Sequence, residues 1–200
     1  MTDYAPQADP VLIPLHADQL DTQQRVLYDE ILGGRAALTT HTALTGPQGQ
    51  LLGPFDPLLR SLEVGAAVQQ LGLALRHKTT LPAVATETAI LTVAISSGAE
   101  FEWYAHSAIV RSRELLSEDD ITRIREVRIP QAEDAALAWE LTQVLLTHSP
   151  ISADQKDRAL TRWQERGLVE LVCMVGHYSN LAILLCGLNI LPPAQTDFRA

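Results

Sequence analysis

The chain has 200 residues, 46% of them hydrophobic, with a formal net charge of −9 and an isoelectric point near 5.0. This length and composition are typical of one globular domain, residues 1–200, with enough apolar side chains for a core of its own. Nucleic acid is excluded as the main partner, because phosphate binding needs a basic surface and the 15 Lys and Arg are spread along an acidic chain.

The N-terminal third is predicted to hold two helices separated by loop. Residues 1–20 are Pro-rich and are expected to form an extended arm. Residues 21–34 read as a helix that ends near Gly33-Gly34, with an apolar face of Val26, Leu27, Ile31 and Leu32. Residues 35–57 are mostly loop, since three Gly and three Pro interrupt them. From Leu58 a helix runs to about residue 78, with a core-facing stripe of Val64, Ala67, Val68, Leu71 and Leu75.

Further helices follow closely in the rest of the chain. The ranges 82–97 and 100–115 are helical, and the first is apolar nearly all round, which predicts burial. Ser117 caps a short helix to about residue 126, and another spans 133–147. Ser152 and Gln155 form a capping box for 153–166, and a long apolar helix to about residue 191 follows Gly167. No alternating strand pattern competes, so we expect an all-α fold of seven or eight helices.

The two cysteines and the long apolar segment bear on location. Cys173 and Cys186 lie about 20 Å apart along one predicted helix and lack metal-ligand spacing, so we expect no disulfide and a reducing, cytoplasmic setting. Residues 1–10 have no basic region followed by an apolar run, so no signal peptide is expected. The segment 168–191 is interpreted as a core helix rather than a membrane span, since it contains Glu170, His177 and Asn180.

A candidate catalytic group lies on the predicted helices 82–97 and 100–115. The very short connection near residue 98 favours an antiparallel hairpin, which brings Glu87 and His106 to face each other within about one turn. Glu102 lies one turn from His106 on the same face. Two carboxylates around an imidazole suit proton transfer, because a carboxylate fixes the imidazole tautomer and the imidazole titrates near neutral pH.

Structural and metal interpretations of these three residues remain open. Glu102 in the first turn of a helix complements the helix dipole, and Glu87 with His106 can form a purely structural pair. Alternatively, Glu102 and His106 four residues apart ligate one ion, together with Glu87 or His177. No dense His or Cys cluster supports that alternative, so we expect no metal and no cofactor.

Other side chains are candidates for contact with a small-molecule substrate. Trp103 adjoins the acidic group, although such a residue more often only packs in the core. His177 and Tyr178 lie on the polar side of the last apolar helix, which faces a crevice, a subunit interface or solvent. The Arg76-His77-Lys78 run supplies charge for a substrate carboxylate or, as such runs more often do, simply interacts with a helix C-terminus at the surface.

The run TETAILTVAISSGAEFEWYAH, residues 86–106, resembles the core hairpin of the carboxymuconolactone decarboxylase-like family, within the alkylhydroperoxidase D-like superfamily. The pieces LLGPFDPLLRS at 51–61 and GLVELVCMVGHYSNLAILLCGLNILPP at 167–193 are also similar. In the alkylhydroperoxidase D branch a Glu, a Cys-x-x-Cys pair and a His share this spacing. Glu87 and His106 match that pattern, but Ala99 and Glu102 stand at the two cysteine positions.

The resemblance implies an activity as well as a fold. Without the cysteine pair, peroxidase chemistry of the peroxiredoxin type is disfavoured. The decarboxylase branch implies a lyase or isomerase acting on a small carboxylated or lactone substrate, with Glu87, Glu102 and His106 as the acid–base group. A non-catalytic scaffold that keeps the fold is the remaining alternative. The family resemblance also implies a symmetric homo-oligomer.

Overall fold

The computed structural model describes residues 10–35 and 43–198, which form eight α-helices and one short 3-10 helix and contain no strand. The prediction of an all-α fold with seven or eight helices is confirmed. The helices are α1 (Thr22–Arg35), α2 (Phe55–Leu58), α3 (Leu62–His77), α4 (Ala83–Ser97), α5 (Glu100–Ser112), α6 (Glu118–Arg125), α7 (Glu133–Leu146) and α8 (Ala153–Gly187).

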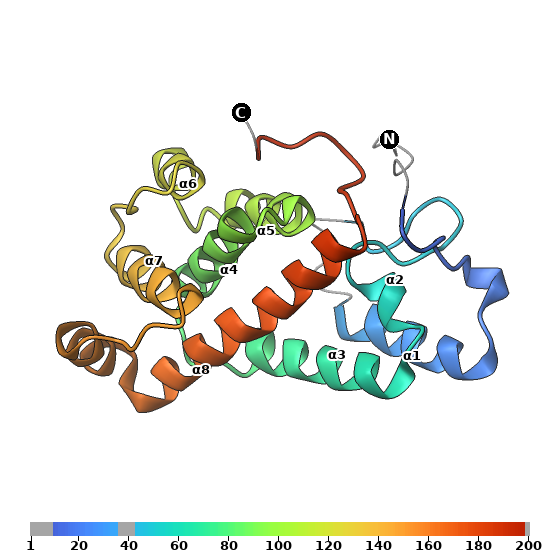
Figure 1. The fold of residues 1–200 in the computed structure, drawn as a ribbon, viewed down its shortest axis with the longest axis horizontal. Helices are drawn as coiled ribbons and strands as arrows, with labels where there is room; N and C mark the ends of the chain where they lie inside the picture. The colour runs from blue at the N-terminus through green and yellow to red at the C-terminus, as the bar shows by residue number, and fades with distance from the viewer. Residues whose placement is uncertain (1–9, 36–42, 199–200) are drawn as a thin grey trace.

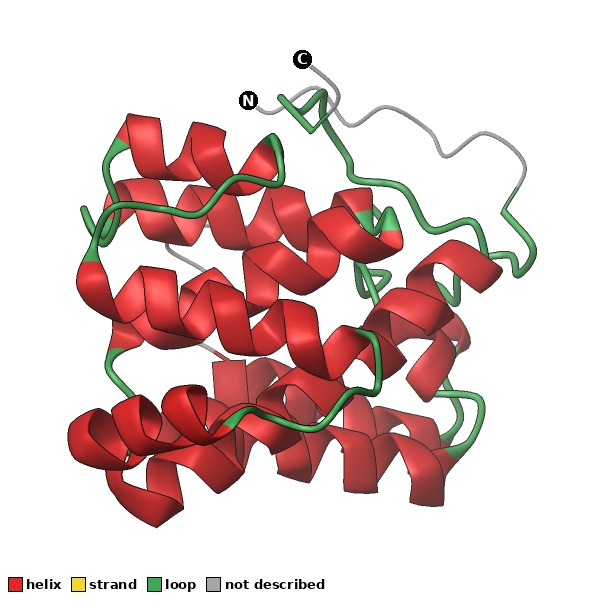
Figure 2. Ribbon diagram, turned by 60° about the vertical axis from the view of Figure 1, so that its left-hand side comes forward, coloured by secondary structure: helices red, strands yellow, loops and turns green. Residues whose placement is uncertain are grey.

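Helix α4 lies at the centre of the fold and contacts α5, α6, α7 and α8. Ten consecutive residues of α4, from 85 to 94, are buried, as its all-round apolar sequence predicts. Helix α3 packs against α8 and also against α1 and α2 (Figure 1), and its C-terminal end reaches α4, where Leu75 shares a core cluster with Ile90. Figure 2 shows the described part of the chain as helices joined by loops, without a strand.

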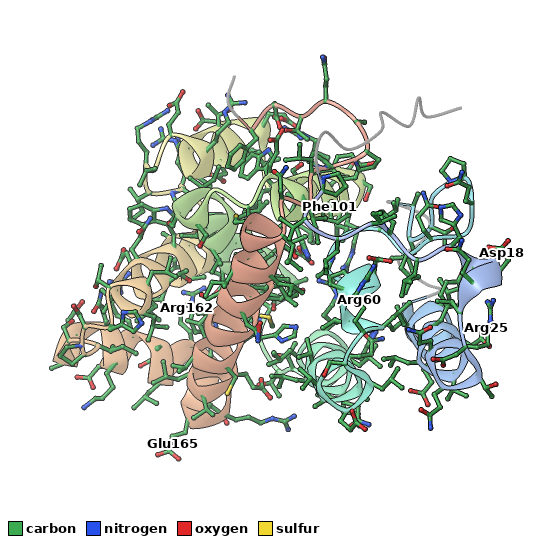
Figure 3. All side chains as sticks on the ribbon, turned by 45° about the vertical axis from the view of Figure 1, so that its right-hand side comes forward. Asp18, Arg25, Arg60, Phe101, Arg162 and Glu165 are labelled. Atoms are coloured by element: carbon green, nitrogen blue, oxygen red, sulfur yellow. The ribbon has the colours of Figure 1, made fainter. Side chains whose placement is uncertain are left out.

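Helix α8 is two helical pieces joined at a kink. The predicted capping box of Ser152 and Gln155 opens it, but the break comes at Gln164, where φ is 60° and ψ is −178°, and not at Gly167. Glu165, the residue after this kink, lies at the opposite end of the long piece of α8 from Phe101 (Figure 3). Among the described residues α8 is the one helix long and apolar enough to cross a membrane, and 44% of its most apolar window is buried inside the protein.

The predicted apolar face of α1 is largely correct, since Leu27 and Ile31 are buried and only Val26 is exposed, at 57%. The predicted face of α3 is largely wrong, because Val64 is 57% and Leu71 is 44% exposed. The buried side of α3 instead carries Gly65, Gln69, Gly72 and Leu75. A Cβ at Gly65 would collide with the backbone carbonyl of Leu58, so small residues rather than large ones let α3 approach α2 closely.

The described part of the N-terminal arm contains little helix, and the loop before α4 is hydrogen-bonded to α8. Of the predicted arm, residues 10–16 lack helix and the 3-10 helix Ala17–Gln19 follows, while residues 1–9 lie outside the described part of the chain. The Glu170 carboxylate of α8 accepts hydrogen bonds from the hydroxyls of Thr79 and Thr80 and from the Thr80 backbone N–H. These bonds and Arg166 outweigh burial and lower the pKa of Glu170 to about 2.

Replacing Gly53 by Ala is expected to destabilise the protein. Gly53 has a φ of 66°, and its missing Cβ would overlap the ring of Phe101. The strained backbone and the displaced ring should together cost about 1–3 kcal/mol of the free energy of unfolding. Gly33→Ala is the matched control, since nothing lies within 4 Å of its Cβ position. Urea unfolding that ranks Gly53→Ala as stable as Gly33→Ala would contradict this account.

Candidate active site

The site is built on the hairpin of α4 and α5. Gly98 ends α4 in the left-handed region, with φ 72° and ψ 20°, and α5 begins two residues later. This tight reversal suits glycine, which adopts positive φ without steric cost. The hairpin predicted from the short connection is therefore present, and it places Glu87 of α4 opposite His106 of α5.

His106 lies between two carboxylates. Its Nδ1 is 2.7 Å from Glu87 Oε2, and its Nε2 is 3.3 Å from Glu102 Oε2. All three side chains are nearly inaccessible to solvent, with side-chain exposures of 8%, 3% and 5% for His106, Glu87 and Glu102. A carboxylate only accepts hydrogen bonds, so a ring that satisfies both neighbours donates from both nitrogens and is an imidazolium.

Arg76 and Tyr178 extend the group on its other side. Arg76, near the end of α3, has a side chain only 7% exposed, and its Nη2 lies 3.4 Å from Glu87 Oε1. Its Nη1 donates to the Tyr178 hydroxyl of α8 at 3.1 Å. The ring of Tyr178 meets that of His106 edge to face, with centroids 5.2 Å apart. Four helices thus each contribute to one hydrogen-bonded group.

Charge pairing overcomes burial at this group. Burial alone disfavours the imidazolium, but the Glu87 charge and the hydrogen bonds of Glu102 and Glu87 raise the pKa of His106 above its usual 6.5. Burial likewise favours a neutral Glu87, yet His106 and Arg76 hold its pKa below the usual 4.5. Both members of the Glu87–His106 pair are therefore charged near neutral pH.

A small cavity adjoins the group. It lies where the loop before α2 meets α3, α5 and α8, and it encloses about 50 Å³, room for about three or four water molecules. Its polar lining consists of Arg76, Glu102, His106 and Tyr178, and its apolar lining includes Leu52, Phe55, Phe101, Ile109 and Leu181. Figure 3 shows Phe101 close to the C-terminal end of α8. Glu87 is behind His106 and is not part of the lining.

The predicted substrate contacts divide between the cavity and elsewhere. Tyr178 lines the cavity, whereas Trp103 and His177 do not. Trp103 is fully buried, and its Nε1–H donates to Asp197 of the C-terminal tail at 2.7 Å. His177 is buried beside Tyr178, with ring centroids 5.3 Å apart. Trp103 is therefore held by the tail rather than presented to a ligand.

Arg76 is the site residue that the sequence alone assigned least well. A cation in the last turn of a helix is usually a surface residue that complements the dipole, and its neighbours His77 and Lys78 are indeed exposed. Its 16-residue helix ends beside the centre of α4, so Arg76 meets Glu87 instead. The usable signal was Glu87 itself, because an ionised carboxylate inside an apolar helix needs a buried partner, and a cation is one such partner.

The described residues around His106 offer little support for a metal site or a reactive thiol. Within residues 10–35 and 43–198, no three His, Cys, Asp or Glu side chains are grouped so that they could hold a metal ion. Both ring nitrogens of His106 already face carboxylates. Cys173 and Cys186 are free and exposed on α8, and neither lines the cavity.

Comparison with known proteins adds no family assignment. None of the protein-family models matches the chain, and none of the curated protein sequences is similar to it.

The free energy of unfolding should depend on pH in a way that reveals the Glu87–His106 ion pair. The pKa of His106 is raised in the folded state, so the stabilisation from His106 is complete below pH 6.5 and is lost as the pH rises through the raised pKa. Glu87 has a lowered pKa, so its contribution is present above pH 4.5 and is lost on acidification. We expect Glu87→Gln to lower the free energy of unfolding by about 3–5 kcal/mol, with the largest effect between pH 4.5 and pH 6.5.

Urea unfolding of the wild type and of Glu87→Gln across pH 4 to 9 measures this difference, with the exposed Glu63→Gln as control. In the same variant, NMR titration should show the His106 pKa lowered. An unchanged His106 pKa would mean that Glu87 does not hold the imidazolium.

Proposed function

We propose that the protein is an acid–base enzyme, a lyase or isomerase acting on a small carboxylated or lactone substrate. The observation that carries this proposal is the position of His106, held as an imidazolium between Glu87 and Glu102 at the wall of a largely apolar cavity. Proton transfer to and from carbon needs such a group, shielded from bulk water and supplied with a proton.

The three residues differ in their access to a ligand. Glu102 lines the cavity, and only its Oε2 is paired, so its Oε1 is without a protein partner among the described residues. Glu102 is therefore the group that exchanges a proton with the substrate. His106 donates to Glu102 and stabilises its charge, and Glu87 holds His106 in orientation from behind. Glu87 is thus a positioning residue rather than a catalytic one.

Two alternatives are less well supported. A thiol peroxidase of the alkylhydroperoxidase D type needs a nucleophilic thiolate at the site, but Ala99 and Glu102 stand at the cysteine positions. Burial also raises the pKa of the Cys186 thiol, which disfavours its thiolate. A non-catalytic scaffold would satisfy its polar groups internally, whereas here a cavity adjoins an unpaired carboxylate oxygen.

Turnover tests the assignment directly. The wild type is incubated with a panel of five-membered lactones with and without a ring carboxylate, and CO₂ release and new vinyl signals are followed by NMR. We expect Glu102→Gln and His106→Ala each to lower turnover about 10²- to 10⁴-fold, since each removes part of the proton-transfer group. Circular dichroism checks that both variants are folded.

The exposed Glu165 and His77 provide matched controls, and Glu165→Gln and His77→Ala should turn over at the wild-type rate. Full turnover by folded His106→Ala would sink the assignment. Peroxide consumption abolished in Cys173→Ser, Cys186→Ser would instead establish the thiol alternative.

We further propose a cytoplasmic homo-oligomer. Two free thiols are consistent with a reducing compartment. Large apolar side chains remain exposed on α8, namely Val169 at 61%, Val172 at 42% and Ile183 at 74%. An exposed apolar stripe of this kind is suited to bury itself against a second copy.

A charge on this stripe should oppose association. We expect the wild type to elute with the mass of an oligomer in size-exclusion chromatography with light scattering, and Ile183→Lys to shift it toward the monomer. Val26→Lys is the control, because Val26 is likewise exposed, at 57%, but lies on α1. A wild-type protein that is monomeric at high micromolar concentration would refute the oligomer.

A further inference from the structure

The charges of the site cancel. Arg76 and His106 are cations, Glu87 and Glu102 are carboxylates, and hydrogen bonds or short ion pairs link them in the order Arg76, Glu87, His106, Glu102. All four side chains are at most 8% exposed. An ionic ligand entering such a group would leave an uncompensated charge away from water, which is costly. An uncharged ligand adds no such cost.

Tyr178 supplies a hydrogen-bond donor that the protein does not use. Its hydroxyl oxygen accepts from Arg76 Nη1 at 3.1 Å, and no described residue accepts the hydroxyl proton. Burial and the charges of Glu102 and Glu87 raise the pKa of Tyr178 against the opposing effect of Arg76, so the hydroxyl stays protonated. Tyr178 and Glu102 line the same cavity, one with a free donor and the other with a free acceptor oxygen.

We propose that the site takes an uncharged carbonyl compound with an acidic C–H, whose carbonyl oxygen binds the Tyr178 hydroxyl while Glu102 removes the proton. This narrows the proposed function, on which it rests, from carboxylated or lactone substrates to uncharged ones. Arg76 polarises the Tyr178 hydroxyl and is a positioning residue. The small enclosed volume confines the reacting end of the ligand to a few heavy atoms.

The chemical step moves one charge without adding any. Glu102 Oε1 takes the proton from the carbon next to the carbonyl, and that C–H pair becomes a C–C π bond. The carbonyl π pair moves to oxygen, so the negative charge passes from Glu102 to an enolate oxygen. That oxygen accepts a stronger hydrogen bond from Tyr178 and lies near the Arg76 charge. Protonated Glu102 then returns the proton to the same carbon or to a conjugated one, which gives exchange or double-bond isomerisation.

Cyclopent-3-enone is a suitable turnover probe, because its isomerisation to cyclopent-2-enone creates an absorbing conjugated enone. We expect the wild type to catalyse this conversion. Tyr178→Phe should lower kcat about 100-fold with a much smaller change in KM, since the hydrogen bond strengthens as the enolate forms. Tyr104→Phe on α5 is the matched control, because Tyr104 lies outside this cavity. A Tyr178→Phe enzyme with wild-type kcat would overturn the oxygen contact.

A binding experiment separates this inference from the proposed function. γ-Butyrolactone and its ring-opened form, 4-hydroxybutanoate, differ by one water and one charge, and ligand-observed NMR measures their binding without turnover. We expect the lactone to bind at least tenfold more tightly, and Tyr178→Phe to weaken it while Glu102→Gln retains it. Equal or tighter binding of 4-hydroxybutanoate would overturn the inference even if Glu102-dependent turnover of a carboxylated lactone is found. Tighter binding of the lactone without any turnover would instead support an uncharged ligand and refute the proposal that the protein is an enzyme.

Discussion

A carboxylate buried at the centre of the fold is the constraint on which the rest of the site depends. Glu87 is 2% exposed within the ten-residue buried stretch of α4. An isolated ionised carboxylate there would be far too costly, so it must be paired or protonated. The protein pairs it twice, with Arg76 of α3 and His106 of α5. Those two contacts require α3 and α5 to meet α4 at one level.

Helix positions are well predicted by local sequence, whereas helix faces are less so. Caps at Ser117 and Ser152 and the stop at Gly98 depend on neighbouring residues alone, and all three are present. The faces of α3 depend on which neighbour it meets. Val64 and Leu71 form a regular apolar stripe but are exposed, because α3 packs through Gly65 and Gly72. Periodicity shows that a helix has two sides, and tertiary contacts decide which is inside.

The candidate site shows the same division. The Glu87–His106 contact was accessible from sequence because a two-residue connection fixes the register of two adjacent helices. Arg76 comes from a separate helix, and Tyr178 lies 102 residues beyond Arg76, so no local rule joins them. Trp103 adjoins Glu102 in sequence but points to the C-terminal tail, where Asp197 also pairs with Arg111 and Arg125. Neighbours on a helix face different parts of the protein.

The Glu170 carboxylate, which binds Thr79 and Thr80, couples the end of α3 to α8. Arg76 lies three residues before this tie, and Tyr178 lies two turns beyond it on α8. Local opening of a protein follows such ties, since elements joined by several hydrogen bonds separate as one unit. The donor that faces the cavity and the cation behind it therefore belong to the same opening unit. Opening of the tied α3–α8 unit would remove both together and leave the proton-transferring hairpin of α4 and α5 intact.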